Sequence, residues 1–165
     1  MISAQEIDSA VSRVAHQLNE RYANGSPLFL GVLNGSYMFL SDLVRKTTFN
    51  SELAFVKLSS YQGTESTGQV TQQYEVDLDI EGRDIIIVED IVETGHSMNY
   101  LLSELQAKRP ASIAICTLFF KPEKFLYDYK VDYVALSIGN EFIVGYGLDY
   151  NQLGRNLKDI YVIDE

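Results

Sequence analysis

The N-terminal part of the chain carries an amphipathic pattern that predicts a helix. Apolar residues recur every three or four positions from Ile7 to Tyr22 and stop before Gly25. Ser3 and Glu6 precede this run with the spacing of a capping box, in which both side chains accept hydrogen bonds from backbone N–H groups at a helix start. We therefore expect a helix that begins at Ser3 and ends near Tyr22.

Further along the chain, short apolar runs alternate with helical patterns. The run 85–88 is continuously apolar and β-branched, which is typical of a central strand covered on both faces, and two acidic residues are expected to end it. The other predicted strands are 28–33, 53–58, 72–78 and 112–119, and the other predicted helices are 37–44 and 97–108. This alternation predicts an α/β fold, a mostly parallel twisted sheet flanked by helices, in a single domain over residues 1–165. The polar residues 59–71 predict a mobile loop.

Composition and charge exclude several classes of function. The chain has 165 residues, of which 46% are apolar, so it is long enough to bury a substantial core. Its net charge of −10 repels phosphate polymers and anionic lipid, so we expect neither nucleic acid nor a membrane as a partner. The single cysteine, Cys116, lies in an apolar run and suits a reducing compartment. The N-terminus lacks a signal-peptide pattern, and we expect a cytoplasmic protein.

Residues 85–98 form the motif that points most directly to chemistry: a strand, two acids, two apolar residues and a polar loop entering a helix. In open parallel sheets, ligands bind beyond the carboxyl ends of strands, and a helix start presents N–H groups to an anion. Thr94, Gly95 and Ser97 suit one phosphate group, since glycine allows close backbone approach and the hydroxyls donate hydrogen bonds. Glu89 and Asp90 suit sugar hydroxyls or a hydrated cation. The motif therefore predicts a phosphate and a ribose bound side by side.

This motif resembles the phosphoribosyl pyrophosphate binding motif of the type I phosphoribosyltransferase family, and the resemblance covers almost the whole chain. It implies that family's fold, with a flexible hood loop and a small base-binding subregion. Other segments are similar to the hypoxanthine-guanine branch. Leu33, Asn34 and Gly35 match its pyrophosphate loop, and Ser60 and Tyr61 match the serine-tyrosine pair of its hood.

The resemblance also implies a base pocket and a metal site. Lys121 matches a lysine beside the purine 6-oxo group, Phe142 an aromatic residue that stacks on the base, and Ile143 a residue whose backbone contacts it. Asp149 matches an aspartate of the base and metal site, and Arg155 a pyrophosphate-binding arginine. The implied cofactor is Mg²⁺, with Asp149, Glu89 and Asp90 as its implied ligands.

Three positions depart from the family pattern. Asn34 replaces a common lysine of the pyrophosphate loop, which leaves a contact through backbone amides in place. Glu93 replaces the aspartate proposed as general base toward purine N7, and its extra methylene changes the reach of the carboxylate. His96 replaces a lysine or a small residue and would contact the 5′-phosphate or solvent.

The resemblance implies transfer of the phosphoribosyl group from phosphoribosyl pyrophosphate to hypoxanthine or guanine, with Glu93, Glu89 and Asp90 as catalytic carboxylates. The open alternatives are a xanthine-preferring or broad 6-oxopurine enzyme, an RNA-binding regulator on the same fold, and a flavodoxin-like binding domain. The chain has no basic cluster, which weighs against RNA. Four segments that agree on one active site weigh against the flavodoxin-like domain. The resemblance also implies a homodimer or homotetramer.

Overall fold

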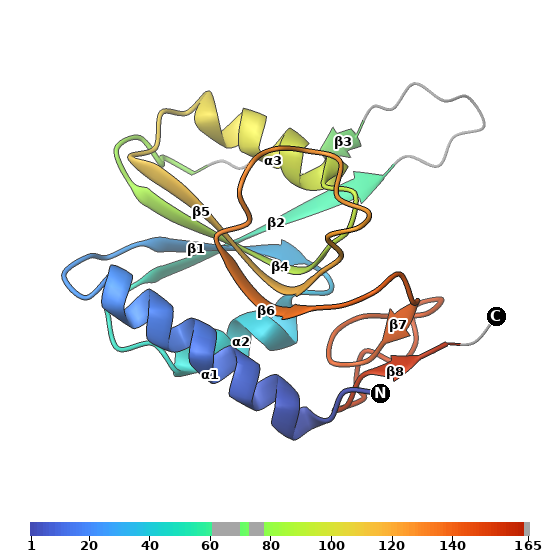
Figure 1. The fold of residues 1–165 in the computed structure, drawn as a ribbon. Helices are drawn as coiled ribbons and strands as arrows, with labels where there is room; N and C mark the ends of the chain where they lie inside the picture. Colours follow the sequence, from blue (N-terminus) through green and yellow to red (C-terminus); the bar gives the residue numbers. More distant parts are fainter. Residues whose placement is uncertain (61–69, 73–77, 164–165) are drawn as a thin grey trace.

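Residues 1–60, 70–72 and 78–163 are described by the computed structural model (Figure 1). Their central feature is a six-stranded sheet in the order β3-β2-β1-β4-β5-β6. Neighbouring strands are parallel except β2 and β3, which confirms the predicted mostly parallel sheet. The strands are β1 Leu28–Leu33, β2 Glu52–Ser60, β3 Val70–Gln72, β4 Asp84–Val92, β5 Ser112–Phe120 and β6 Tyr133–Ser137.

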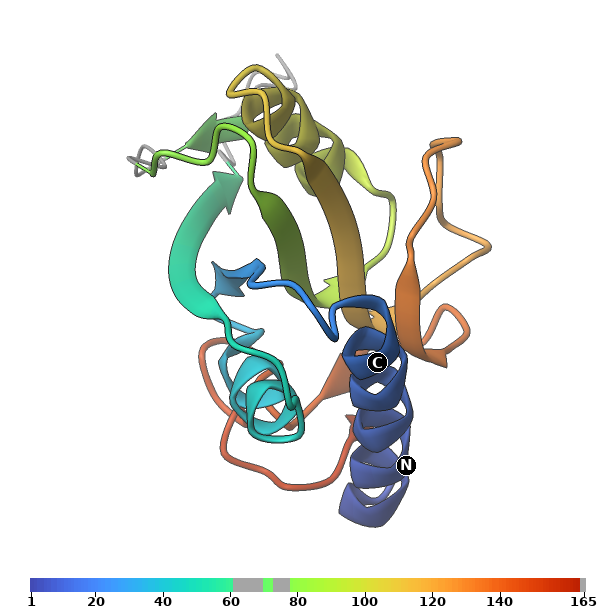
Figure 2. The ribbon, with the colours of Figure 1, turned by 90° about the vertical axis from the view of Figure 1, so that its left-hand side faces the viewer.

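Helices cover both faces of this sheet (Figure 2). Helices α1 (Ala4–Arg21) and α2 (Tyr37–Arg45) lie on one face, and α3 (His96–Gln106) lies on the other. The predicted capping box starts α1: Ser3 Oγ accepts from the Glu6 N–H at 3.3 Å, and Glu6 Oε2 accepts from the Ser3 N–H at 2.8 Å. Within the described ranges, no helix is long and apolar enough to cross a membrane.

The core consists of two hydrophobic clusters, one on each face of the sheet. Successive side chains of a strand point to opposite faces. Ile86 and Val88 therefore pack with α1 and α2, whereas Ile85 and Ile87 pack with α3. All four side chains are fully buried, and each contributes about 1.5–3 kcal/mol to stability. This packing holds β4 in the centre of the sheet, and the acidic residues follow at its carboxyl end.

Strand β4 differs from the expectation that two acids would end it. It continues through Glu89 and Asp90 to Val92. It does so because β5 pairs with it along this stretch, with Glu89 opposite Thr117 and Val92 opposite Phe120. Backbone hydrogen bonds to β5 thus extend the strand past the two acidic residues, which by their sequence alone were expected to end it.

Other element boundaries also differ from the predictions. Of the strand expected over 72–78, Gln72 lies in a strand, as the last residue of β3, and Leu78 lies outside any strand. Residues 73–77 are outside the described part. Helix α3 begins at His96, one residue earlier than expected, and ends at Gln106.

A small second sheet follows β6 and was not predicted as strands. It pairs β7 (Ile143–Val144) with β8 (Tyr161–Val162) in antiparallel fashion. Ile2 and Ile160 exchange backbone hydrogen bonds of 2.9 and 2.8 Å, so the N-terminus lies beside this sheet (Figure 1). Strands of two residues carry no readable period, which is why the hydrophobic pattern missed them. The segment occupies the place of the small subregion that the resemblance implied.

Candidate functional site

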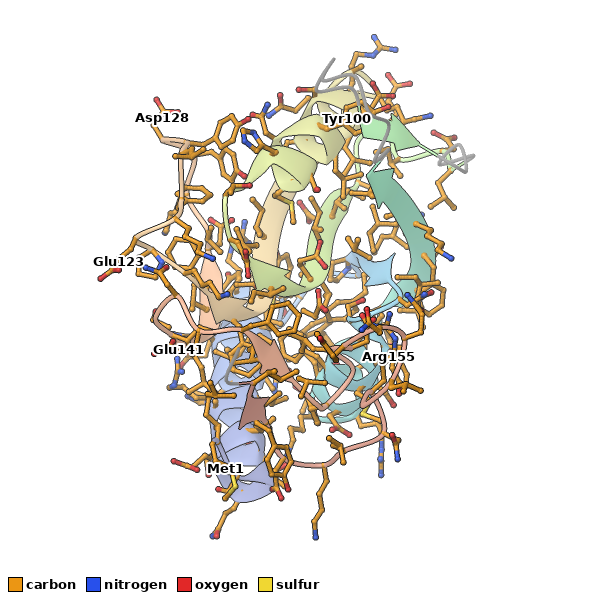
Figure 3. The ribbon with its side chains drawn as sticks, turned by 90° about the vertical axis from the view of Figure 1, so that its right-hand side faces the viewer. Met1, Tyr100, Glu123, Asp128, Glu141 and Arg155 are labelled. Carbon is orange, nitrogen blue, oxygen red and sulfur yellow. The ribbon has the colours of Figure 1, made fainter. Side chains whose placement is uncertain are left out.

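The polar segments singled out in the sequence gather at the carboxyl edge of the sheet. Strands β1, β4 and β5 are parallel neighbours, with Gly31 opposite Val88 and Val92 opposite Phe120, so the loops that follow them emerge at the same edge. Figure 3 looks toward this edge, with Arg155 on one side and Glu141 on the other. Ligands of open parallel sheets bind at this position.

A pocket of about 180 Å³ lies where β4 passes into α3. It is lined by Glu89 and residues 91–98, so it brings together the residues predicted for the 5′-phosphate: Thr94, Gly95, His96 and Ser97. Gly95 is the N-cap of α3 with φ of 86°, a left-handed conformation that glycine adopts without strain. The first turn of α3 therefore opens its N–H groups toward the pocket, an arrangement that favours an anion.

Residues 125–129, which follow β5 and which we call the aromatic loop, pack against Gly95 of this pocket; the sequence did not predict this contact. A methyl group at Gly95 would lie 2.6 Å from Tyr129 Oη and 2.7 Å from the Phe125 ring. Tyr129 Oη donates to the Gly95 carbonyl at 2.8 Å, and the Leu126 N–H donates to the Thr94 carbonyl at 3.1 Å. The signal available in the sequence was the spacing of aromatic residues at every second position, 125, 127 and 129, outside any apolar run.

Glu89 and Asp90 form a tightly coupled, partly buried acidic pair at the end of β4. Burial raises the pKa of Glu89 well above its usual range, and the neighbouring Asp90 charge adds to this shift. Burial also raises the pKa of Asp90, although hydrogen bonds from Glu89 and the Ile91 N–H and the charge of Arg155 oppose it. Two carboxylates held this closely favour cationic or hydroxyl ligands, which relieve their repulsion.

The loop after β1 lies directly against this acidic pair. A methyl group at Gly35 would overlap the Asp90 carboxylate, and one at Gly147 would overlap the Gly35 carbonyl oxygen. Glycine at both positions thus allows the predicted pyrophosphate loop to sit between β4 and the segment after β7. The Leu33–Asn34 peptide bond at the start of this loop is cis.

Arg155 and Asp149, far from that loop in the sequence, pack beside it. Arg155 Nη2 lies 2.8 Å from Asp149 Oδ1, and Nη1 donates to the Gly147 carbonyl at 2.7 Å. Their side chains are only 21% and 26% exposed. The structure thus brings the predicted pyrophosphate-binding arginine and the predicted metal-site aspartate together next to Gly35.

Glu93 and Lys121 form an ion pair at the mouth of the site. Lys121 Nζ lies 2.5 Å from Glu93 Oε1 and donates to the Glu141 carbonyl at 2.9 Å. The Lys121 side chain is 2% exposed and Glu93 is 40% exposed, so the carboxylate faces the pocket while the ammonium is buried. Lys124 Nζ lies 3.7 Å from the other Glu93 oxygen. The carboxylate predicted to act on the base and the lysine predicted to bind its oxygen are therefore direct neighbours.

The aromatic residue predicted to stack on a base is accessible. Phe142 is 48% exposed, and its ring meets that of Tyr150 edge to face, with centroids 5.8 Å apart. Tyr150 was not predicted as a site residue; its place after Asp149 was the available signal. Ile143 is buried and begins β7, so its backbone is fixed by that strand. Phe142 is thus a flat apolar surface on a rigid support.

The hood and the metal site stay predictions. Ser60 ends β2, whereas Tyr61 and the rest of the hood lie outside the described ranges. Within those ranges, no cluster of three or more His, Cys, Asp or Glu side chains could hold a metal ion. A cation at this edge would therefore need ligands beyond Glu89, Asp90 and Asp149, such as the oxygens of a substrate.

Known proteins resemble this chain in sequence and in fold. The family model described as phosphoribosyl transferase domain matches residues 3–151. A hypoxanthine-guanine phosphoribosyltransferase from Streptococcus pyogenes serotype M3 is 42% identical over 166 residues, covering 100% of this chain and 92% of that protein. The crystal structure of a hypoxanthine-guanine phosphoribosyltransferase from Bacillus anthracis is 33% identical, with a TM-score of 0.94 over 99% of this chain and 97% of that one. The crystal structure of a hypoxanthine phosphoribosyltransferase from Staphylococcus aureus is 38% identical, with a TM-score of 0.92 over 99% of this chain and 90% of that one.

Proposed function

Because this chain belongs to the phosphoribosyl transferase domain family, we propose that it is a purine salvage enzyme that uses hypoxanthine, guanine or both. It transfers the 5-phosphoribosyl group from phosphoribosyl pyrophosphate to the base, giving IMP or GMP and pyrophosphate. The observation that carries this proposal is the Glu93–Lys121 pair beside the pocket at the start of α3. In this pair the Glu93 carboxylate can accept a proton from a purine and the Lys121 ammonium can donate a hydrogen bond to it, and both lie next to a pocket suited to a phosphate.

Phosphoribosyl pyrophosphate would lie along the carboxyl edge of the sheet. The 5′-phosphate binds the N–H groups and hydroxyls of residues 94–97, at the positive end of α3. The ribose hydroxyls bind Glu89 and Asp90. The pyrophosphate binds the backbone amides of the loop 33–35 and Arg155, which packs beside that loop. This order follows the order of the loops along the edge.

The purine would bind between Phe142 and the Lys121 ammonium. Stacking on the exposed Phe142 ring buries the apolar faces of the base, and the backbone of Ile143 meets its edge. Lys121 Nζ donates to the 6-oxo group, whereas the amino group of adenine offers no comparable acceptor. The buried ammonium therefore favours hypoxanthine and guanine over adenine.

In the reaction, the bond between the anomeric carbon and the pyrophosphate oxygen breaks, and its electron pair leaves with pyrophosphate. Purine N9 forms the new bond to that carbon. Glu89 and Asp90 stabilise the positive charge that develops on the ribose, and Glu93 accepts the proton that the purine releases. Arg155 stabilises the departing charge. Each of these groups lies at the same edge of the sheet.

The donor set at this edge fits Mg²⁺ bound together with the substrate. Mg²⁺ prefers oxygen ligands and is usually held by one or two carboxylates plus substrate phosphates, without an all-protein cage. Glu89, Asp90 and Asp149 supply such carboxylates. When bound, the ion would neutralise negative charge on the pyrophosphate.

The test is pyrophosphate release from phosphoribosyl pyrophosphate in the presence of Mg²⁺, with one base in each reaction. The bases are hypoxanthine, guanine, xanthine, adenine and orotate. Turnover with hypoxanthine or guanine but not adenine supports the reaction and the base pocket. Turnover with xanthine alone would replace the substrate assignment. No turnover with any base contradicts the proposed function.

We further propose that residues 1–165 act as one domain in the cytoplasm and assemble into a homodimer or homotetramer. The six-stranded sheet, to which strands from residue 28 to residue 137 contribute, supports the single domain, and the buried free thiol of Cys116 supports the cytoplasm. Leu53 and Phe55, on the same face of β2, are 52% and 50% exposed and would be covered by a second copy. Light scattering after size exclusion should give twice or four times the 18.6 kDa chain mass. A mass of one chain would contradict the assembly.

A further inference from the structure

His96 is held by a tyrosine that the proposed mechanism does not use. It is the first residue of α3 and lines the pocket assigned above to the 5′-phosphate. Its Nδ1 atom lies 2.7 Å from Tyr127 Oη, and the two rings meet edge to face at 89°. Among the described residues, no other hydrogen bond to the His96 ring is formed. The ring nitrogen that remains for a ligand is therefore Nε2.

Tyr127 is itself fixed in place by the aromatic loop. Its ring packs against Tyr129 and Phe125, with centroid distances of 5.4 and 6.3 Å. The loop is tied to the pocket on both sides of Tyr127, through the Leu126 N–H and the Tyr129 hydroxyl. The hydroxyl of Tyr127 is thus presented to His96 by a rigid support, which lowers the entropy cost of the hydrogen bond.

The direction of this hydrogen bond decides what His96 offers to the pocket. A neutral imidazole carries one N–H and one bare nitrogen, and the partner of one nitrogen sets the state of the other. If Tyr127 donates to Nδ1, then Nε2 carries the proton and is a donor. If Nδ1 donates to Tyr127, then Nε2 presents a lone pair, which repels a phosphate oxygen. A phenol is the better donor and an imidazole nitrogen the better acceptor, so the first arrangement is favoured.

We propose that Tyr127 is a positioning residue that holds His96 in the Nε2–H tautomer and so supplies the phosphate pocket with one more N–H donor. The donor is present on the neutral ring, without protonation to imidazolium. This inference rests on the proposed function for the identity of the phosphate, although the tautomer itself is a property of the free protein. Tyr127 acts through His96 and does not touch the ligand.

The tautomer is measured by NMR, from the ¹⁵N shifts of the histidine rings at a pH where titration shows both to be neutral. The chain has only two histidines, and His16 lies on α1 with Nε2 3.5 Å from the exposed Glu20, so it serves as an internal reference. We expect the Nε2–H pattern at His96 in the wild type and a mixture of tautomers in Tyr127→Phe. An Nδ1–H pattern in the wild type, or an unchanged pattern in the variant, overturns the proposal.

The functional consequence is measured by a double-mutant cycle. Tyr127→Phe keeps the ring packing and should raise the KM for phosphoribosyl pyrophosphate about three- to tenfold, with kcat little changed, as for loss of one hydrogen bond. In a His96→Gln background the amide nitrogen donates regardless of Tyr127, so the same substitution should have no further effect. Tyr161→Phe, on β8, is the matched control and should leave KM unchanged.

The two possible failures can be distinguished. An undiminished effect of Tyr127→Phe in the His96→Gln background means that Tyr127 acts through the loop, which overturns the inference. If the wild type turns over no base, the proposed function fails, but the tautomer is still read in the free protein. A titration with ribose 5-phosphate then reports binding: a shift of the His96 Nε2 signal that Tyr127→Phe weakens supports the inference, and no shift overturns it.

Discussion

Replacing Glu93 by Gln tests the ion pair at the mouth of the site. Gln keeps the size and one acceptor oxygen of Glu but removes the charge that faces the Lys121 ammonium at 2.5 Å. Because the Lys121 side chain is 2% exposed, water cannot replace the lost counter-charge there. The substitution should therefore lower both stability and turnover, for separate reasons that separate assays can measure.

The expected loss in the free energy of unfolding follows from the burial of Glu93 and Lys121. Breaking a fully buried ion pair costs about 3–5 kcal/mol, whereas exposed pairs contribute about 0–1 kcal/mol. Since Glu93 is 40% exposed and Gln still accepts a hydrogen bond, we expect a loss of about 1–2 kcal/mol. For a domain of this length, that loss lowers the thermal midpoint by about 2–8 °C. Loss of the proton acceptor should lower turnover on hypoxanthine about 10²–10⁴-fold.

The assay combines thermal unfolding with initial rates on hypoxanthine, using the exposed Glu104→Gln on α3 as the matched control. In a Lys121→Met background, the same Glu93 substitution should cost less stability, because no buried ammonium is left unpaired. An unchanged thermal midpoint together with unchanged turnover across neutral pH would refute the reasoning. A drop in stability with full turnover would support the ion pair but would exclude Glu93 as the proton acceptor.

Three further predictions follow from single contacts. Gly35→Ala should raise the KM for phosphoribosyl pyrophosphate about tenfold or more, because the added methyl group overlaps the Asp90 carboxylate. In the control Gly25→Ala the methyl group makes only ordinary contacts, so the KM should stay unchanged, and equal KM values in both variants would contradict the geometry. Phe142→Ala should raise the KM for hypoxanthine about 5- to 100-fold through loss of stacking, with stability little changed because the ring is 48% exposed; an unchanged KM would exclude this ring from the base site. Tyr146→Phe removes a 2.5 Å hydrogen bond to a carboxylate on α2 and should lower the free energy of unfolding by about 1–2 kcal/mol in urea denaturation, a loss that an unchanged midpoint would disprove.

Local patterns in the sequence determined the first helix, the central strand and the phosphate loop. The capping box at Ser3 needs only residues three apart, and it forms as predicted. The apolar run 85–88 specifies a doubly covered strand, and the polar loop into α3 follows directly from it. Each of these features is decided by neighbours within one or two turns or strand lengths, which is the range over which periodicity and capping act.

The contacts between distant segments were decided only by the tertiary structure. Glu93 and Lys121 are 28 positions apart and meet because β4 and β5 are parallel and end in register. The extension of β4 past its acids and the aromatic support of His96 also depend on segments that no local pattern connects. Sequence alone therefore determined which residue types stand at the ends of the strands. The register of the sheet and the packing of its loops decided which of them touch, because side-chain contacts at a shared edge depend on distances that chain spacing does not encode.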